Sequence, residues 1–127
     1  MPLESYIIAK LCKELKLKDI NVHTQDFEYE AADASRIQDF LNYYKSRKLN
    51  HIEKSLLIKL ILESYNDYFQ SNANDAEKNR NSEIVPILSS EYLQHRDILD
   101  YWACGTEKLE DCFAITPLVR DFLSQVD

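Results

Sequence analysis

Three residues with side chains that could bind a metal lie in the last third of the sequence, namely His95, Cys104 and Cys112. Zinc prefers imidazole and thiolate ligands, and its sites normally begin with two cysteines or two histidines about two to five residues apart, a spacing that sets the chelate bite. The sequence has no such pair. We therefore expect no metal and no cofactor, and a metal-binding or enzymatic helical protein that uses these three residues remains an alternative.

The same cysteines are weak candidates for a catalytic nucleophile. A reactive thiol needs a neighbouring base and an electropositive setting, whereas Cys104 and Cys112 lie among carboxylates, which raise a thiol pKa. The third cysteine, Cys12, falls on an apolar helix face, where packing is the ordinary role. An odd number of cysteines without a disulfide-like spacing indicates reduced thiols in the cytosol. The sequence thus predicts a cytoplasmic protein that is not an enzyme.

The excess of acidic over basic residues is confined to the second half of the chain. Residues 1–63 contain ten acidic and ten basic residues, whereas residues 64–127 contain twelve acidic and five basic residues, so the net charge of −7 arises there. A surface of one sign attracts a cationic partner and repels nucleic acid. The alternative is a solvated acidic surface that only keeps the protein soluble. Five acidic residues surround the turn at Gly105, offset within that span by Lys108 alone: Asp97, Asp100, Glu107, Glu110 and Asp111.

Aromatic residues accompany this acidic cluster. Tyr101 and Trp102 lie within it, and exposed tyrosine and tryptophan are enriched at the centres of protein interfaces. The alternative is that the many tyrosines of this chain cap the edge of the core with their hydroxyls in water. The predicted partner-binding residues are Asp97, Asp100, Tyr101, Glu107, Glu110 and Asp111.

Glycine and proline are scarce, with one and three residues respectively among 127. Hairpins and phosphate-binding loops need more positions with positive φ, so the composition favours helices and excludes both a P-loop and a GxGxxG dinucleotide site. This length suits one domain. The expected fold is an all-α, compact bundle of about five to six helices forming a single domain over residues 1–127.

Apolar residues at helical spacing predict where these helices lie. An amphipathic helix is expected over residues 4–16 and another over 35–48. Asn50 and Glu53 have capping-box spacing and open a helix so apolar that it should be the central helix of the core. Further helices are expected from Ser89 or Ser90 to Gly105, over 106–113, and from Thr116 with Pro117 onwards.

Three stretches do not have a helical pattern. Residues 17–32 are expected to be irregular, with a short extended segment as the alternative. Residues 84–88 surround Pro86 and are expected to form a buried extended or one-turn segment. Residues 71–82 are rich in asparagine and are expected to form a mobile loop.

These features predict a small acidic protein-binding module. No signal-like segment opens the sequence, and no apolar run approaches the ~20 residues of a membrane span, so we expect no membrane partner and no nucleic-acid partner. A basic protein is the expected partner, and the favoured setting is an immunity protein or inhibitor that neutralises a basic bacterial toxin, such as a nuclease, by covering its active site or functional surface. The further alternative is a homo-oligomeric regulatory subunit that buries Tyr43, Tyr65 or Trp102 at its interface, and the oligomeric state is left open.

Overall fold

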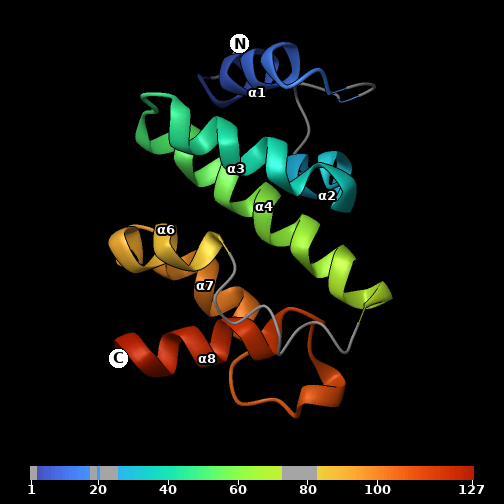
Figure 1. Cartoon of the computed structure of the whole chain (residues 1–127), viewed down its shortest axis with the longest axis vertical. Coiled ribbons are helices and arrows are strands. Elements are labelled where there is room, and N and C mark those ends of the chain that lie inside the picture. Colours follow the sequence, from blue (N-terminus) through green and yellow to red (C-terminus); the bar gives the residue numbers. More distant parts are fainter. Residues whose placement is uncertain (1–2, 18–19, 21–25, 73–82) are drawn as a thin grey trace. The chain divides into compact units, whose positions relative to one another are not determined.

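The computed structural model describes residues 3–17, 20, 26–72 and 83–127, and within these residues all regular structure is helical (Figure 1). This confirms the all-α prediction. The expected mobile loop at 71–82 falls mostly outside the described residues. In chain order the elements are α1 (Leu3–Glu14), α2 (Phe27–Ala31), the one-turn 3₁₀ helix η1 (Ala34–Arg36), α3 (Ile37–Ser46), α4 (His51–Ser71), α6 (Ile84–Glu91), α7 (Arg96–Ala103), the one-turn 3₁₀ helix η2 (Leu109–Asp111) and α8 (Thr116–Val126).

The chain divides into two compact units, Met1–Ser64 and Tyr65–Asp127. The boundary falls inside α4, which continues from one unit into the other. The prediction of a single domain over residues 1–127 therefore remains a prediction.

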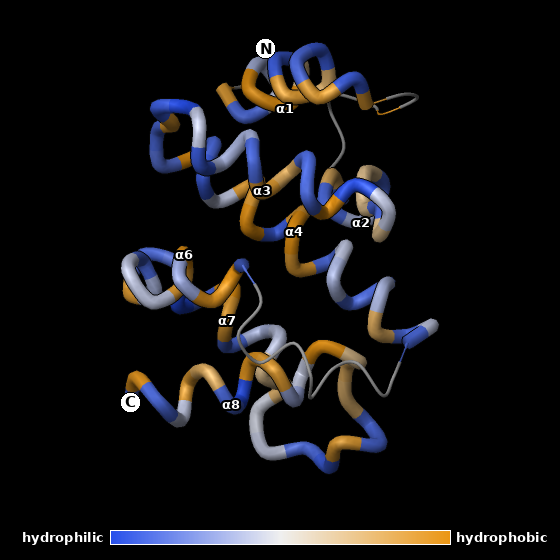
Figure 2. The backbone as a smooth tube through the Cα atoms, in the orientation of Figure 1, coloured by the Kyte–Doolittle hydropathy of each residue, from blue (hydrophilic) through white to orange (hydrophobic). Residues whose placement is uncertain are grey.

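The first unit is built on amphipathic helices. In α1, Ile7, Ile8 and Leu11 are buried while lysines and glutamates face solvent, as the helical spacing predicted. The helix ends at Glu14, and Lys16 then has a left-handed φ of 55° that redirects the chain. Figure 2 shows the corresponding alternation of hydrophobic and hydrophilic residues along α1 and α3.

The start of α4 has the capping box that the sequence predicted. The Asn50 side chain accepts a hydrogen bond from the Glu53 backbone N–H at 2.8 Å, and the Glu53 carboxylate accepts one from the Asn50 backbone N–H at 3.2 Å. Two N–H groups that the helix itself leaves without partners are thereby satisfied. The expected burial of this helix is also confirmed, by a run of six side chains that are at most 4% exposed: Leu56, Leu57, Ile58, Leu60, Ile61 and Leu62.

The second unit contains the end of α4 together with α6, α7, η2 and α8. The helices α7 and α8 pack against each other. Buried apolar side chains come from all three helices of this group: Ile84, Ile87 and Leu88 of α6, Leu99 and Trp102 of α7, and Leu118, Val119, Phe122 and Leu123 of α8. The end of α4 adds Tyr65 and Phe69.

Several predicted boundaries were wrong. Residues 84–88, expected to be a buried extended or one-turn segment, are partly buried as expected but belong to the eight-residue helix α6. Pro86 lies in its first turn, where the missing N–H breaks no helical hydrogen bond. The helix predicted from Ser89 or Ser90 is divided, with a turn at 92–95 before α7. The region 106–113 forms only η2, and α2 is a helix of five residues inside the stretch expected to be irregular.

Within the described residues, no helix combines the length and the apolar character that a membrane crossing would require.

Candidate functional site

All six predicted partner-binding residues lie in the second unit and are solvent-exposed. Asp97, Asp100 and Tyr101 project from α7, where spacings of three and four residues place Asp97 on the same side as the other two. Glu107 precedes η2, and Glu110 and Asp111 form part of it. We refer to these six exposed residues, three from α7 and three from η2 and the loop before it, as the acidic surface.

Tyr101 stands on a support of aromatic rings. Its side chain is 62% exposed, yet its ring centroid lies 5.2 Å from that of buried Trp102 and 5.2 Å from that of Phe113. Trp102 and Phe113 in turn meet edge to face at 4.7 Å. Such contacts limit the motion of the tyrosine ring, so less side-chain entropy is lost when a partner covers it.

Buried hydrogen bonds fix this support to α8. Thr116 is fully buried, and its hydroxyl donates to the Trp102 carbonyl at 2.8 Å while accepting from the Phe113 N–H at 3.1 Å. Ile115, rather than Thr116, occupies the N-cap position of α8, so the hydroxyl expected to cap this helix instead joins it to α7. The Asn66 side chain accepts a hydrogen bond from the Ile115 N–H at 3.0 Å.

The loop between α7 and α8 turns through two consecutive left-handed residues. Cys104 has a φ of 64° and Gly105 a φ of 57°, and only glycine adopts this conformation without strain. The sequence predicted a helix stop at Gly105. The stop is in fact formed at Cys104, one residue earlier, and the glycine follows it.

The side chain of Arg120 in α8 binds backbone carbonyls of the same loop. Its Nε donates to the Ala103 carbonyl at 2.8 Å, and its Nη2 donates to the Glu107 carbonyl at 2.8 Å and to that of Gly105 at 3.4 Å. A guanidinium at the end of α7 also opposes the negative end of the helix dipole. The backbone that carries Glu107 is therefore anchored to α8.

A second arginine neutralises part of the acidic surface. Arg96 donates to the Asp100 carboxylate at 3.0 Å and, through both terminal nitrogens, to Asp127 at 2.7 and 2.9 Å. The hydrogen bonds and positive charge of Arg96 hold the pKa of the Asp127 carboxyl below its ordinary value. Asp100 is thus an ion-paired residue, a role that the sequence did not reveal.

Four carboxylates of the acidic surface have no basic side chain of the described residues in direct contact with them. Asp97, Glu107, Glu110 and Asp111 form no ion pair with any lysine or arginine that the structure describes. Residues 83–127 contain nine acidic and three basic residues, and of the three only Lys108 is not engaged with Asp100, Asp127 or the loop carbonyls. The field of this surface is accordingly negative.

An open groove of about 450 Å³, lined by both polar and apolar atoms, adjoins the loop. Leu109 lies on its edge, 55% exposed, in the middle of the acidic residues of η2. Together with Tyr101, this leucine gives the acidic surface apolar contact points. The groove is lined by Phe69, Gln70, Leu109, Cys112, Phe113, Ala114 and Pro117.

The residues of the metal-binding alternative have other surroundings. His95 is 1% exposed at the N-cap of α7. Cys104 and Cys112 form a disulfide with Cα atoms 5.9 Å apart. The prediction that all three thiols are reduced was wrong, because a tight loop brings together two cysteines separated by eight positions. Among the described residues, no group of three or more His, Cys, Asp or Glu side chains is arranged to hold a metal ion.

The aromatic residues of the homo-oligomer alternative are buried in the chain itself. Tyr43, Tyr65 and Trp102 are each at most 7% exposed. Large apolar or aromatic side chains that do face solvent are Leu3, Tyr6, Tyr29, Leu93, Tyr101 and Leu109.

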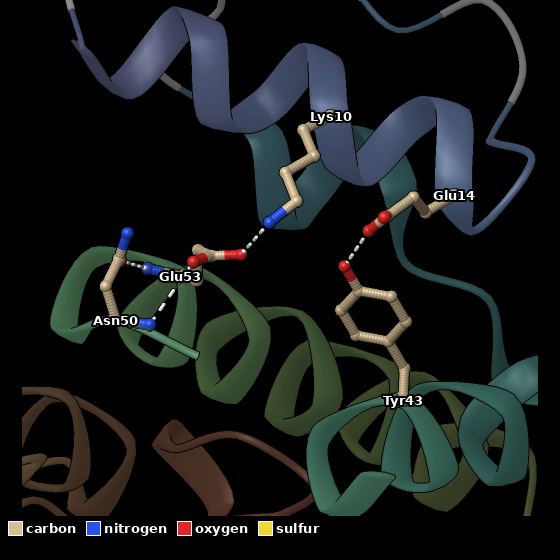
Figure 3. Close-up of polar contacts among 5 residues, drawn as sticks. All are labelled: Lys10, Glu14, Tyr43, Asn50 and Glu53. Carbon is tan, nitrogen blue, oxygen red and sulfur yellow. Dashed lines mark hydrogen bonds and ion pairs between the residues drawn. The ribbon is translucent and has the colours of Figure 1, made fainter. Parts of the chain in front are cut away.

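The first unit has a polar cluster of its own, which sequence reasoning found only in part (Figure 3). Lys10 of α1 donates to the Glu53 carboxylate at 2.9 Å, and the Tyr43 hydroxyl of α3 donates to Glu14 of α1. Burial, reinforced by the Glu14 carboxylate, raises the pKa of the Tyr43 hydroxyl. The Asn50 and Glu53 capping box was readable from spacing, whereas Lys10 is 43 positions away from its partner. These contacts join α1 to α3 and α4.

Comparison of the chain with protein-family models, with curated proteins and with solved structures yields no match.

Proposed function

We propose that this chain is a small protein-binding module whose acidic surface docks on a basic surface of another protein. The observation that carries the proposal is the exposed Tyr101 ring, which rests on Trp102 and Phe113. The same part of the chain supplies four exposed carboxylates that have no ion-pair partner in the described residues, those of Asp97, Glu107, Glu110 and Asp111. Interfaces of high affinity combine a rigid aromatic anchor with a charged rim. This surface has both.

The setting we favour is an immunity protein or inhibitor of a basic bacterial toxin such as a nuclease. A nuclease binds phosphates, so its functional surface is positively charged, and an acidic inhibitor gains association rate and specificity from the opposite field. The four uncompensated carboxylates supply that field. This choice of partner rests on charge complementarity.

The partner can be sought by low-salt capture from the native cell, followed by binding measurements with the purified candidate. Raising the salt concentration should weaken binding mainly through a slower association rate. The Tyr101→Ala variant should weaken binding by about 30-fold or more, as loss of an aromatic anchor does. Circular dichroism establishes that this variant is folded.

A matched pair of charge reversals tests the position of the interface. Glu107→Lys, Glu110→Lys and Asp111→Lys together should abolish binding. Glu4→Lys, Glu28→Lys and Glu30→Lys together change the net charge equally but lie in the first unit, and they should leave the affinity within a few-fold of the parent. Equal effects of the two triple variants, or insensitivity to both, would refute the proposal.

A further inference from the structure

The disulfide between Cys104 and Cys112 closes the loop that carries Glu107, Leu109 and Glu110. Its Cα separation of 5.9 Å falls within the range of ordinary disulfides. Both cysteines are half-buried, so the bond lies at the surface rather than in the core. An external thiol can therefore approach it.

The two sulfurs have different surroundings. The Nη2 atom of Arg120 lies 3.5 Å from Sγ of Cys112, while the same guanidinium is fixed by the carbonyls of Ala103 and Glu107. For Cys104, the structure gives no such contact among the described residues. The sulfur of Cys112 therefore lies beside a guanidinium that hydrogen bonds to two backbone carbonyls hold in place.

The carboxylates of this region oppose the effect of the Arg120 charge on the sulfur, but they are exposed to solvent. Glu107, Glu110 and Asp111 are all exposed, as is Lys108, so water and salt screen their effect on the sulfur. Arg120 is half-buried and in direct contact with it. The sequence suggested that acidic neighbours would dominate at both cysteines; at Cys112 the guanidinium of Arg120 is a direct contact that opposes them.

We propose that the Cys104–Cys112 disulfide is a thiol–disulfide exchange site for low-molecular-weight thiols, in which Cys104 is the sulfur attacked and Cys112 is the leaving thiolate held by Arg120.

The exchange takes place in two steps. The thiolate of an external thiol attacks Sγ of Cys104, a new S–S bond forms, the Cys104–Cys112 bond breaks, and its electron pair stays on Sγ of Cys112. A second external thiolate attacks the external sulfur of the mixed disulfide and releases Cys104 as a thiolate, which takes up a proton. Two external thiols are oxidised to a disulfide, and the protein disulfide is reduced by two electrons.

The direction of attack follows from leaving-group chemistry. A thiolate of lower pKa leaves faster, and a guanidinium beside a sulfur stabilises its thiolate. Attack at Cys104 expels the thiolate of Cys112, which Arg120 stabilises, whereas attack at Cys112 would expel the thiolate of Cys104, which has no such neighbour among the described residues.

The first test compares the three thiols one at a time. Cys112 alone (C12S/C104S), Cys104 alone (C12S/C112S) and Cys12 alone (C104S/C112S) are titrated by their rate of alkylation with iodoacetamide as a function of pH. We expect the pKa of Cys112 to lie below the ordinary value of about 8.5 and that of Cys104 to lie above that of Cys112. Cys12 is the internal control, because burial raises the pKa of its thiol. A Cys112 pKa at or above that of Cys104 would overturn the proposal.

The second test separates the charge of Arg120 from its structural role. In the C12S/C104S background, Arg120→Gln should raise the Cys112 pKa by about one unit, which lowers the thiolate fraction about tenfold below that pKa. Arg120→Lys, which keeps the charge but loses the fork of hydrogen bonds, should recover most of the shift. Equal pKa values in the two variants would mean that the arginine only holds the loop, and the proposal would fail.

The third test locates the mixed disulfide. The oxidised C12S protein is treated with reduced glutathione, quenched with iodoacetamide and mapped by peptide mass spectrometry. We expect glutathione on Cys104 and the alkyl group on Cys112. Glutathione found on Cys112, or a disulfide that stays intact while dithiothreitol cleaves it in the unfolded protein, contradicts the proposal. The result does not depend on whether the acidic surface binds a protein.

Discussion

The ammonium group of Lys10 lies 2.9 Å from the carboxylate of Glu53, which is only 4% exposed and also accepts the backbone N–H of Asn50. One carboxylate therefore caps α4 and binds α1 to it (Figure 3). Burial alone would raise the pKa of Glu53, but the hydrogen bonds from Lys10 and Asn50 and the charge of Lys10 outweigh burial and lower it. The hydrogen bond and charge of Glu53 correspondingly raise the pKa of Lys10.

Replacing Lys10 by methionine should destabilise the first unit. The substitution leaves a buried carboxylate without its cation, at a cost of about 1–2 kcal/mol near neutral pH, since the lysine itself is half exposed and screened by water. Urea denaturation followed by circular dichroism measures this difference. Lys13→Met is the matched control, because Lys13 lies exposed on the same helix, and it should change stability by less than about 0.5 kcal/mol.

The same pair should produce a pH dependence of defined sign. The pKa of Glu53 is lower in the folded chain than its ordinary value of 4.5, so its stabilising contribution is complete above that value and is lost as the pH falls through the folded pKa. In Lys10→Met this contribution is absent. The stability difference between parent and variant should therefore shrink as the pH falls below about 4.5. A difference that grows on acidification would contradict this assignment.

The cap at Asn50 can be tested independently. Asn50→Ala removes the acceptor for the Glu53 N–H and should cost about 1 kcal/mol. Asn42→Ala is a suitable control, since the one hydrogen bond that Asn42 accepts among the described residues is an exposed one from the Gln38 side chain, four residues earlier. It should cost at most about 0.5 kcal/mol in the same denaturation experiment. An equal loss of unfolding free energy in the two variants would show that the capping box does not stabilise the fold more than an exposed side-chain hydrogen bond does.

Sequence reasoning succeeded where the determining interactions are local. The capping box of Asn50 and Glu53 can be recognised from their spacing of three residues. The apolar residues that follow are typical of a buried helix, and they are buried. Sequence reasoning failed at α6, where residues 84–88 around Pro86 were expected to be extended or one turn long, because the first turn of a longer helix tolerates proline. The division of the predicted helix before α7 was missed for a similar reason, since residues 92–95 retain a helix-like pattern.

The candidate site shows the same limit. Its acidic residues could be recognised from charge, and all of them are exposed. Arg96 and Arg120 could not be assigned, because their partners Asp127 and Cys112 meet them only through the packing of α7 and α8. Nor does a spacing of eight residues between Cys104 and Cys112 signal a disulfide by itself. Contacts between residues of different helices can be assigned only once the fold is known.

The aromatic support of Tyr101 depends on Thr116. Thr116→Val keeps the shape of the side chain but leaves the Trp102 carbonyl and the Phe113 N–H without this partner, at a cost of about 2 kcal/mol. Fluorescence of Trp102, the only tryptophan, reports unfolding of the second unit. Thr106→Val, at an exposed position of the loop, is the control and should be nearly neutral. Comparable losses in both variants would argue against the buried hydroxyl as the cause.

The continuity of α4 through the boundary at Ser64 predicts that the two units unfold together. Urea transitions monitored by Trp102 fluorescence and by helical circular dichroism should coincide, as expected of one cooperative domain. Lys10→Met, a change in the first unit, should then shift the Trp102 transition as well. Two separated transitions, with only the dichroism responding to Lys10→Met, would instead indicate two independent domains.

Reduction of the Cys104–Cys112 disulfide should lower the stability of the folded chain. Closing so short a loop in the unfolded state removes chain entropy worth about 2.5 kcal/mol, so dithiothreitol should lower the free energy of unfolding of the C12S protein by up to that amount. Because Arg120 still binds the carbonyls of Ala103 and Glu107, the reduced loop should keep its fold, and the Trp102 signal of the native state should change little. The C104S/C112S variant should have the stability of the reduced protein and should not respond to dithiothreitol. An equal response of that variant would place the effect of the reagent elsewhere in the chain.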